Sequence, residues 1–318
     1  MKKVLIVGAT GQDGAYLSKL LLEKGFKVIG TSRDASVCDT SRLKKLNVLD
    51  DIKLISLAPN DFRNVLKVIS TFKPSRIYNL SGQTSVGLSF DQPVECIDSI
   101  AGATLNFLEA LRFFSDDIKF FNAGSSECYG NINNHQKATE ESSFMPRSPY
   151  AIAKSTAYWL VSNYRESYNI FCCTGILSNH ESPLRNKRFV TKKIVSAAHA
   201  IKNGEMKFLL LGNINIYRDW GWAPDYIKAI WLMMQRNQAR DFIIGSGKTY
   251  SLREFVNKVF RYLNISKKNL RTNVSKYKRK IDLRGYKANI VETQKVLKWK
   301  PSVKFDTIIY KMINNELF

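Results

Sequence analysis

The sequence predicts an α/β protein, a doubly wound parallel sheet with a smaller C-terminal α/β lobe. Two observations predict it. Short apolar segments alternate with segments of helical apolar spacing through the first half of the chain, and a glycine-rich turn joins the first pair. Strands that alternate with helices run parallel, because each helix crosses back over the sheet and covers one of its faces.

Six strands and four helices are expected in the first half. The expected strands are Val4–Val7, Lys27–Thr31, Lys53–Leu57, Arg76–Leu80, Lys119–Ala123 and Phe171–Ile176. The expected helices are Tyr16–Glu23, Arg63–Phe72, Gly102–Phe113 and one that begins near Pro149 and continues through Ser155–Tyr168. Their apolar residues recur at helical spacing, so each helix can pack one face against the sheet.

The second half is more mixed and predicts a smaller lobe. The expected helices are Phe189–Lys202, Asp225–Met234 and Ser251–Leu263, the last with Ser251 as its N-cap. The expected strands are Lys207–Leu211 and Phe242–Ile244. We therefore predict a nucleotide-binding domain over residues 1–178, to which later segments return, a lobe formed mainly by residues 179–318, and a cleft between them.

Composition narrows the class of protein. The chain has 318 residues, 44% of them hydrophobic, and its 49 Lys+Arg against 27 Asp+Glu give a formal net charge of +22. Such a charge is compatible with nucleic-acid binding, but the lysines are spread along the chain and the densest stretch, Lys276–Lys280, is short. We interpret the charge as a solvated surface that favours polyanionic ligands, and we expect no nucleic-acid partner.

Cysteine usage and hydropathy predict the compartment. Five cysteines, an odd number without a CxxC pair, predict a reduced cytoplasmic protein with no disulfide scaffold and no metal site. The apolar run Val4–Val7 is too short for a signal peptide and leads straight into a glycine-rich turn. No segment approaches the roughly 18 apolar residues of a membrane span, so no membrane association is expected.

The glycine-rich turn has the sequence Gly8-Ala-Thr-Gly11-Gln-Asp-Gly14. Glycine allows a tight turn and a close approach of the backbone to a pyrophosphate, and the helix N-terminus adds NH groups and partial positive charge. Its position between a strand and a helix makes the predicted sheet Rossmann-like and indicates a dinucleotide cofactor. The spacing is GxxGxxG, which resembles the extended short-chain dehydrogenases.

The end of the second expected strand distinguishes NADP from NAD. A carboxylate there binds the ribose hydroxyls and repels a 2′-phosphate, whereas this chain has Thr31, Ser32 and Arg33. Arg33 can pair with the 2′-phosphate, although Asp34, directly after it, opposes that pairing. We predict NADP.

Tyr150-Ala-Ile-Ala-Lys154 is the second chemical motif. The spacing puts both side chains on one face of a helix. The reference pKa of tyrosine is near 10, too high for a base at neutral pH. We expect the neighbouring ammonium to lower this pKa, so that the phenolate can take a proton from a sugar hydroxyl.

The third motif, Gly124–Gly130, directly follows an expected strand, where α/β sheets carry their chemistry. Ser125 can hydrogen-bond the reacting hydroxyl and Glu127 can serve as a second base. A C4 epimerase or reductase needs only the Tyr–Lys pair and a hydroxyl. A 4,6-dehydratase must also remove the C5 proton and release the C6 hydroxyl, so Glu127 favours a dehydratase.

Longer stretches resemble the GDP-mannose 4,6-dehydratase family over nearly the whole chain. They are Gly8–Leu17 (GATGQDGAYL), Tyr78–Val86 (YNLSGQTSV), Pro146–Lys154 (PRSPYAIAK), Asn163–Tyr168 (NYRESY), Gly175–Arg185 (GILSNHESPLR), Phe189–Ile194 (FVTKKI), Leu211–Gly221 (LGNINIYRDWG) and Asp225–Tyr226. The resemblance implies an NADP-dependent hydro-lyase that converts GDP-mannose to GDP-4-keto-6-deoxymannose and works as a homodimer or homotetramer, in which residues 33–42 reach a neighbouring subunit.

The resemblance also implies residue roles. The catalytic positions fall on Ser125, Glu127, Tyr150 and Lys154. The positions that hold NADP fall on Gly8, Thr10, Gly11, Gln12, Asp13, Gly14, Arg33, Leu80, Ser81, Gly82, Gln83, Thr84, His180 and Arg185. The positions that hold the GDP-sugar fall on Ser85, Asn179, Val190, Lys193, Arg218, Arg279 and Asp282. Residues 1–178 thereby become the NADP-binding domain and residues 179–318 mainly the sugar-nucleotide lobe.

Several positions depart from the family pattern. Ser125 stands where the family usually has threonine, and Asp34 where it has a second arginine. Ala58 lies in the stretch that replaces an acidic residue after the third strand, and Trp222 lies in an altered segment on the sugar-nucleotide side. The change near Ala58 affects the adenine contacts. The segment around Trp222, together with an altered acidic pattern at Lys280–Arg284, leaves room for a different GDP-sugar, such as a GDP-heptose.

Three other interpretations remain open. They are a dehydratase of another GDP-sugar, an NDP-sugar epimerase or reductase on the same scaffold, and a basic nucleic-acid-binding or scaffold protein on an inactive enzyme fold. A reductase would consume NADPH stoichiometrically, and an RNA-binding protein would show salt-sensitive binding to random RNA. The intact Glu127, Tyr150 and Lys154 argue against the last interpretation.

Overall fold

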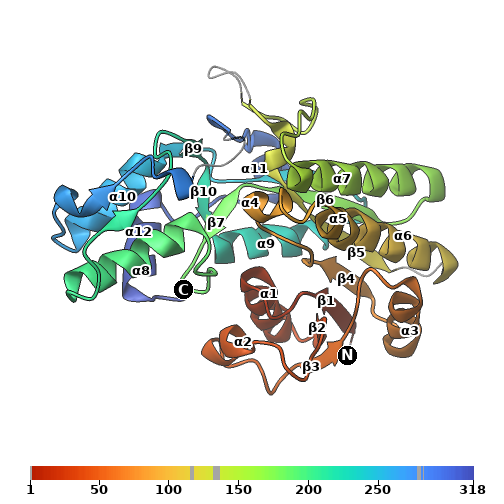
Figure 1. Ribbon diagram of the computed structural model, residues 1–318. Coiled ribbons are helices and arrows are strands. Elements are labelled where there is room, and N and C mark those ends of the chain that lie inside the picture. Colours follow the sequence, from red (N-terminus) through yellow and green to blue (C-terminus); the bar gives the residue numbers. More distant parts are fainter. Residues whose placement is uncertain (1, 115–117, 132–136, 278–280, 282) are drawn as a thin grey trace.

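A computed structural model describes residues 2–114, 118–131, 137–277, 281 and 283–318 (Figure 1). Its centre is a seven-stranded sheet in the order β11-β6-β5-β4-β1-β2-β3, with every neighbouring pair parallel. The strands are β1 (Lys3–Val7), β2 (Lys27–Ser32), β3 (Lys53–Ser56), β4 (Arg76–Asn79), β5 (Lys119–Ser125), β6 (Cys172–Leu177) and β11 (Phe242–Ile244). The chain winds outward in both directions from β1 and β4, which confirms the predicted doubly wound sheet.

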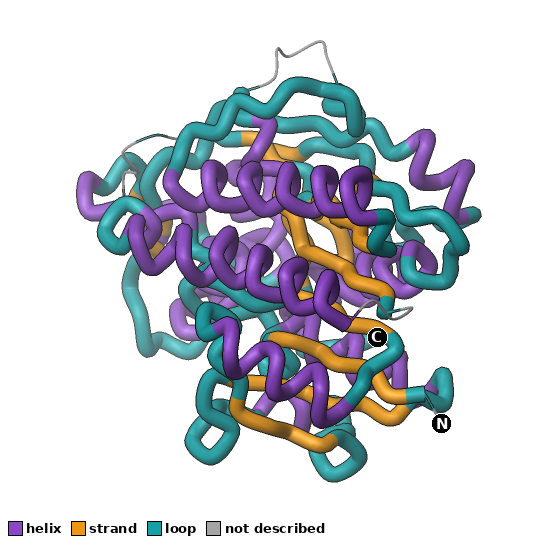
Figure 2. Tube along the Cα trace, turned by 90° about the vertical axis from the view of Figure 1, so that its right-hand side faces the viewer, coloured by secondary structure: helices purple, strands orange, loops and turns teal. Residues whose placement is uncertain are grey.

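Helices cover both faces of this sheet (Figures 1 and 2). One layer contains α1 (Gln12–Glu23), α9 (Ala223–Met233) and α11 (Val291–Leu297). The other contains α3 (Phe62–Phe72), α6 (Ala103–Phe114) and α7 (Pro149–Tyr168). Successive strand residues point to opposite faces, so Ile6 packs in the core with α1 and α9 while Leu5 packs in the core with α3 and α6.

A second core lies in the C-terminal half. It is formed by α8 (Val190–Lys202), α10 (Leu252–Tyr262) and α12 (Phe305–Asn314), with Trp220 and Phe255 among its buried aromatic residues. Three two-stranded sheets accompany these helices. They pair β7 (Asn179–Glu181) with β10 (Trp220–Trp222), β9 (Tyr217–Arg218) with β12 (Tyr250–Ser251), and β8 (Leu209–Leu210) with β13 (Leu270–Arg271).

Short helical elements complete the described chain. They are α2 (Ser41–Lys45), α4 (Val86–Ser89), α5 (Pro93–Ile97), the π-helical turn Asp98–Gly102 that leads into α6, and the 3-10 turns Ser126–Tyr129, Lys267–Asn269 and Ser275–Tyr277.

The expected strands of the first half are confirmed to within two residues at each end. Ser251 caps α10 as predicted, in a capping box with Glu254. The first helix begins at Gln12, earlier than Tyr16, because the glycine-rich turn passes directly into it. The sequence analysis missed α12, although Phe305, Ile308, Ile309 and Met312 have helical spacing. From the second half of the chain, β11 joins the main sheet as an edge strand, and α9 and α11 pack on that sheet.

Candidate functional site

The glycines of the phosphate loop serve two different geometric needs. Gly8, directly after β1, has a φ of +86°, a conformation that side chains other than glycine rarely adopt. A Cβ on Gly14 would lie 2.3 Å from the carbonyl oxygen of Gly8 and 2.6 Å from the Cα of Ala9. Gly14 therefore lets α1 start against the end of β1, so that the first NH groups of α1 face the loop.

A cavity of about 910 Å³ opens beside this loop. Nine of the residues predicted to bind the cofactor line it: Gly8, Thr10, Gly11, Arg33, Leu80, Ser81, Gly82, Gln83 and Thr84. A buried amide donor, Nε2 of Gln83, has no hydrogen-bond partner among the described residues. The cavity volume, the glycine cradle and this unpartnered donor fit a dinucleotide whose pyrophosphate rests on the loop.

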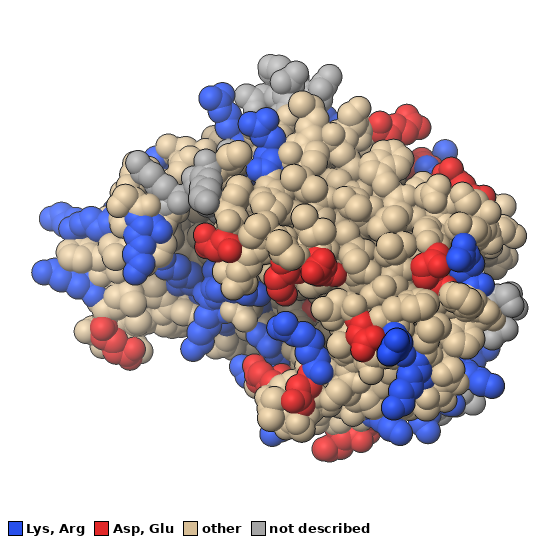
Figure 3. All heavy atoms as spheres, turned by 45° about the vertical axis from the view of Figure 1, so that its right-hand side comes forward, with Lys and Arg blue, Asp and Glu red and all other residues tan. Residues whose placement is uncertain are grey.

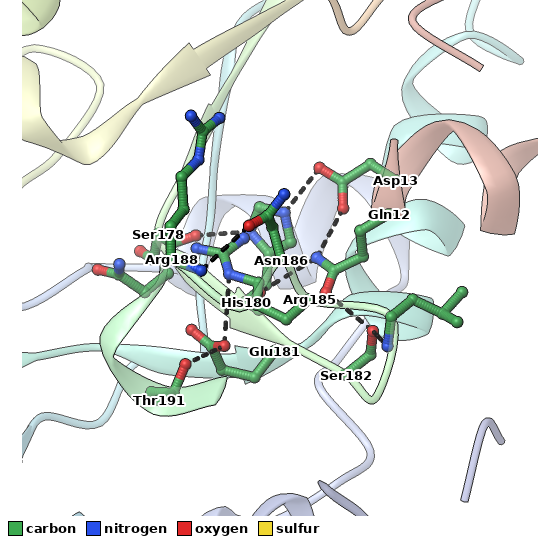
Figure 4. A network of polar contacts seen from close by, with 12 residues as sticks. Gln12, Asp13, Ser178, His180, Glu181, Ser182, Arg185, Asn186, Arg188 and Thr191 are labelled. Carbon is green, nitrogen blue, oxygen red and sulfur yellow. Dashed lines mark hydrogen bonds and ion pairs between the residues drawn. The ribbon is translucent and has the colours of Figure 1, made fainter. Parts of the chain in front are cut away.

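Gln12 and Asp13, at the end of the loop where α1 begins, belong to a polar network with His180 and Ser182 (Figure 4). The amide of Gln12 donates to the carbonyl oxygen of His180 at 3.3 Å and accepts from the hydroxyl of Ser182 at 2.8 Å. Neither Gln12 nor Asp13 lines this cofactor cavity. These residues fasten the loop to β7.

His180 completes that attachment. Its Nδ1 lies 2.8 Å from the carbonyl oxygen of Ser178, and its Nε2 lies 2.8 Å from a carboxylate oxygen of Asp13. Only an imidazolium can donate at both nitrogens. Burial disfavours that charge, but the Asp13 carboxylate outweighs burial and raises the pKa of His180. Burial also disfavours the Asp13 carboxylate, yet His180 and the amide of Gln12 bring the pKa of Asp13 down to about 2.

The four predicted catalytic residues line one cavity of about 260 Å³. Ser125 ends β5, and its Oγ accepts a hydrogen bond from the backbone N of Glu127 at 3.3 Å. This contact starts the 3-10 turn that carries Glu127. Tyr150 and Lys154 lie in the first turns of α7, which Ser148 caps. Local hydrogen bonds at a strand end and a helix start thus aim the four side chains at one space.

The pKa of Tyr150 is raised in this structure, whereas the sequence predicted a lowered one. Nζ of Lys154 donates to the carbonyl oxygen of Ala123 at 2.6 Å. Burial raises the pKa of Tyr150 well above its usual value, and contact with Ser125 and the charge of Arg185 only partly oppose the rise. Burial also lowers the pKa of Lys154 to about 8. The enclosing protein, more than the ammonium, therefore sets the protonation of Tyr150.

Arg218 joins Glu127, an arrangement that the sequence did not reveal. The Nε of Arg218 lies 3.8 Å from a carboxylate oxygen of Glu127. Its Nη1 donates to the carbonyl oxygens of Tyr217 and Leu283, which hold the buried guanidinium in place. Predicted to hold the GDP-sugar, Arg218 thus also borders the proposed base.

The remaining predicted substrate residues divide between two cavities. Ser85, Asn179 and Val190 line the catalytic cavity. Val190 and Lys193 line an adjoining cavity of about 150 Å³. The Nζ of Lys193 donates to the carbonyl oxygen of Leu210 at 2.8 Å. Arg279 and Asp282 lie outside the described residues.

Arg185, predicted to hold the cofactor, lines the catalytic cavity and not the cofactor cavity. Its guanidinium lies 3.9 Å from the ring centroid of Phe189, and its Nε lies 3.4 Å from a carboxylate oxygen of Glu181. Glu181 also accepts a hydrogen bond from the hydroxyl of Thr191 at 2.5 Å. Through these contacts β7 links the phosphate loop with the start of α8 (Figure 4).

Arg188 is a candidate ligand-binding residue that the sequence analysis missed. It lines all three cavities. Its Nη2 donates to the hydroxyl of Thr84 at 3.0 Å, a contact between the two halves of the chain. It is exposed and has no carboxylate partner within the part of the chain that the structure describes. The basic segment around Arg185 was the only sequence signal that could have indicated it.

The residues that the structure describes contain no group of three or more His, Cys, Asp and Glu side chains arranged to hold a metal ion. Within the same residues, no helix is both long enough and apolar enough to cross a membrane. The five cysteines, all of them described, are free thiols.

Comparisons with known proteins agree with this geometry. The chain matches the family model described as GDP-mannose 4,6 dehydratase over residues 5–312. It is 37% identical to GDP-mannose 4,6 dehydratase 1 of Arabidopsis thaliana, over 99% of this chain and 90% of that protein. It is 44% identical to a GDP-mannose 4,6-dehydratase of Vibrio cholerae, over 83% of this chain and 72% of that protein. Its fold is similar to that of a dTDP-glucose 4,6-dehydratase from Streptomyces venezuelae, with a TM-score of 0.88, 18% identity, and coverage of 98% of this chain and 96% of that chain.

Proposed function

The chain belongs to the GDP-mannose 4,6-dehydratase family, and from this premise we propose that it converts GDP-mannose to GDP-4-keto-6-deoxymannose and water. The observation that carries the proposal is that Glu127 lines the same cavity as Ser125, Tyr150 and Lys154. A second base beside the Tyr–Lys pair is what an elimination needs and a C4 epimerisation does not.

The first step oxidises C4 of the sugar. Tyr150, as its phenolate, takes the proton of the C4 hydroxyl while Ser125 hydrogen-bonds the same oxygen. Bound NADP⁺ would supply the acceptor for the C4 hydride, the hydride that later returns to C6, and a positive charge that would favour the phenolate of Tyr150, whose pKa burial raises. We propose that Lys154 contributes mainly by holding position.

The second step eliminates water. The 4-ketone acidifies the C5 proton, and Glu127 removes it as a base. The same carboxyl group then protonates the departing C6 hydroxyl, so that water leaves and a C5–C6 double bond forms. Hydride added at C6 and a proton added at C5 complete the 6-deoxy-4-keto product. Loss of a proton from Tyr150 balances the proton gained at C5 and restores its phenolate. The guanidinium of Arg218, with its Nε 3.8 Å from a carboxylate oxygen of Glu127, helps to keep this side chain in place.

The cofactor proposal is NADP. Its support is the cavity beside the phosphate loop, with Arg33 at the end of β2. The phosphate loop is shaped and fastened by Gln12, Asp13, Gly14 and His180. We propose that Arg185, which lines the catalytic cavity, faces the space between cofactor and sugar.

The substrate proposal is a GDP-sugar. Its support is a set of polar and basic side chains around the two smaller cavities, namely Ser85, Asn179, Lys193 and Arg218, with the apolar Val190 between them and Arg188 added from the geometry. Arginine and lysine suit the diphosphate of such a ligand. The division into an NADP-binding domain over residues 1–178 and a sugar-nucleotide lobe over residues 179–318 stays a prediction.

The test incubates the protein with GDP-mannose and a trace of NADP⁺, without reductant, and follows the mass of the nucleotide sugar. We expect loss of one water with no net consumption of cofactor. If GDP-mannose is inert while a GDP-heptose or another NDP-hexose loses water, the substrate is wrong and the reaction class stands. Stoichiometric consumption of NADPH without dehydration would instead indicate a reductase.

Single substitutions test which residue serves which of the two steps. Tyr150→Phe removes the proton acceptor of the first step, so no reduced cofactor should appear on adding substrate. Glu127→Gln keeps the shape and removes the second base, so absorbance of NADPH should rise and persist while exchange of the C5 proton with deuterated solvent falls by about 10²–10⁴-fold. Glu141→Gln, an exposed matched change, should behave as wild type. Normal C5 exchange in Glu127→Gln would remove Glu127 from this role.

We also propose a homodimer, or a homotetramer if the loop at residues 33–42 forms a second contact. Exposed apolar side chains lie on α5, α6 and α7, namely Ile97, Leu105, Ile152 and Trp159. Figure 3 shows a wide area with few charged atoms over these helices, which supports pairing with a second copy. Trp159→Lys should lower the mass measured by light scattering. Free thiols favour a reducing compartment, and we propose the cytoplasm.

A further inference from the structure

The loop after β2 carries two opposite charges beside the cofactor cavity. Arg33 lines this cavity together with Thr31 and Ser32, whereas Asp34 is not among its lining residues. The cavity wall therefore presents the cation and not the carboxylate that follows it in sequence.

Ser36 accounts for the position of Asp34. One carboxylate oxygen of Asp34 accepts hydrogen bonds from the backbone N of Ser36 at 2.9 Å and from its Oγ at 2.6 Å. The backbone N of Ala35 donates to Oγ of Ser56 at 2.9 Å, which ties this turn to the end of β3. The turn is thus held at both its carboxylate and its backbone.

The charge of Asp34 makes its position matter. The hydrogen bond from the Ser36 hydroxyl, followed by that from the Ser36 backbone, lowers the pKa of Asp34. Asp34 is therefore ionised at neutral pH. A carboxylate at the end of the second strand binds ribose hydroxyls and repels a 2′-phosphate. NADP binding therefore requires that the Asp34 carboxylate stay away from the 2′-phosphate.

We propose that Ser36 is a positioning residue for cofactor specificity: its hydroxyl holds Asp34 outside the cofactor cavity and leaves Arg33 alone to face the 2′-phosphate. The inference rests on the proposed use of NADP. Without the hydroxyl, Asp34 can turn toward the ribose, where it repels the phosphate of NADP and accepts hydrogen bonds from the free hydroxyls of NAD.

The test measures dissociation constants of NADP⁺ and NAD⁺ by calorimetry, on the full chain freed of nucleotide, at low ionic strength. Ser36→Ala should raise the Kd of NADP⁺ by about two- to fivefold, the range for exposed charge pairs, and should leave the Kd of NAD⁺ unchanged or lower. Added salt should shrink the difference. Ser36→Thr keeps the hydroxyl and should retain the wild-type ratio of the two constants.

The Asp34→Asn background identifies the cause. There Ser36→Ala should have no further effect on NADP⁺, because the charge that Ser36 controls is gone. An equal loss of NADP⁺ affinity in the wild-type and Asp34→Asn backgrounds would mean that Ser36 contacts the phosphate itself. An unchanged ratio of the two dissociation constants in Ser36→Ala would mean that Asp34 is held without the Ser36 hydroxyl. Either result overturns the inference. A wild-type protein that binds NAD⁺ as tightly as NADP⁺ would overturn the proposed cofactor, and with it the inference.

Discussion

Asp13→Asn should weaken the attachment of the phosphate loop and should do so in a pH-dependent way. Asparagine keeps the shape of the side chain and removes the charge that faces Nε2 of His180 at 2.8 Å. His180 then loses the partner that raises its pKa. Its imidazolium becomes a largely buried cation without a counter-ion, and its neutral form can donate at only one nitrogen.

The expected loss of stability follows from the pKa of the Asp13 carboxyl group. Its pKa falls from 3.8 to about 2 in the folded protein, and each unit corresponds to about 1.4 kcal/mol. The charged pair therefore contributes about 2 kcal/mol to the free energy of unfolding. Because the pKa of Asp13 is lowered, its contribution is present above pH 3.8 and is lost as the pH falls toward 2. Because the pKa of His180 is raised, its contribution is present below pH 6.5 and is lost as the pH rises through the folded value.

Urea unfolding, followed by tryptophan fluorescence at several pH values, measures this difference. Asp13→Asn should lose the most stability relative to wild type between about pH 4 and 6.5, and less at pH 9. Asp51→Asn removes an exposed carboxylate and should change stability little at any pH. A loss in Asp13→Asn that is the same from pH 4.5 to pH 9 would refute the argument, since it would mean that packing and not the ion pair holds the loop.

Three further predictions concern the cavities. Arg33→Ala should raise the Kd of NADP⁺ roughly tenfold or more and hardly change that of NAD⁺, because a charge-assisted contact to phosphate is worth about 1.5–3 kcal/mol; equal weakening of both would mean that Arg33 does not bind the 2′-phosphate. Gly14→Ala would place a Cβ 2.3 Å from the carbonyl oxygen of Gly8, so thermal unfolding should start at lower temperature and dinucleotide binding should be lost. Gly102→Ala, with no atom within 4 Å of its new Cβ, should keep the wild-type unfolding temperature and dinucleotide binding. Arg188→Ala should weaken binding of GDP and of NADP⁺ in titrations, because Arg188 lines all three cavities; Lys187→Ala is the matched control, and a loss for neither ligand would exclude the role.

Local patterns in the sequence were sufficient for the sheet and for the position of the catalytic motifs. Short apolar runs predicted the strands because a doubly covered sheet buries both faces of each strand. Gly8 and Gly14 predicted the phosphate loop because only glycine meets those backbone constraints. Tyr150 and Lys154 are four residues apart on one helix, so their common face was determined before any tertiary contact was known.

Tertiary structure decided which of these groups influence one another. The ion pairs of Arg218 with Glu127 and of His180 with Asp13 join segments far apart in the chain, and no local pattern encodes such contacts. The same holds for the protonation of Tyr150, which depends on how completely other segments bury its hydroxyl. The sequence could determine which ionisable groups the site contains, but their pKa values depend on distance and on the exclusion of water, and only the folded chain sets those.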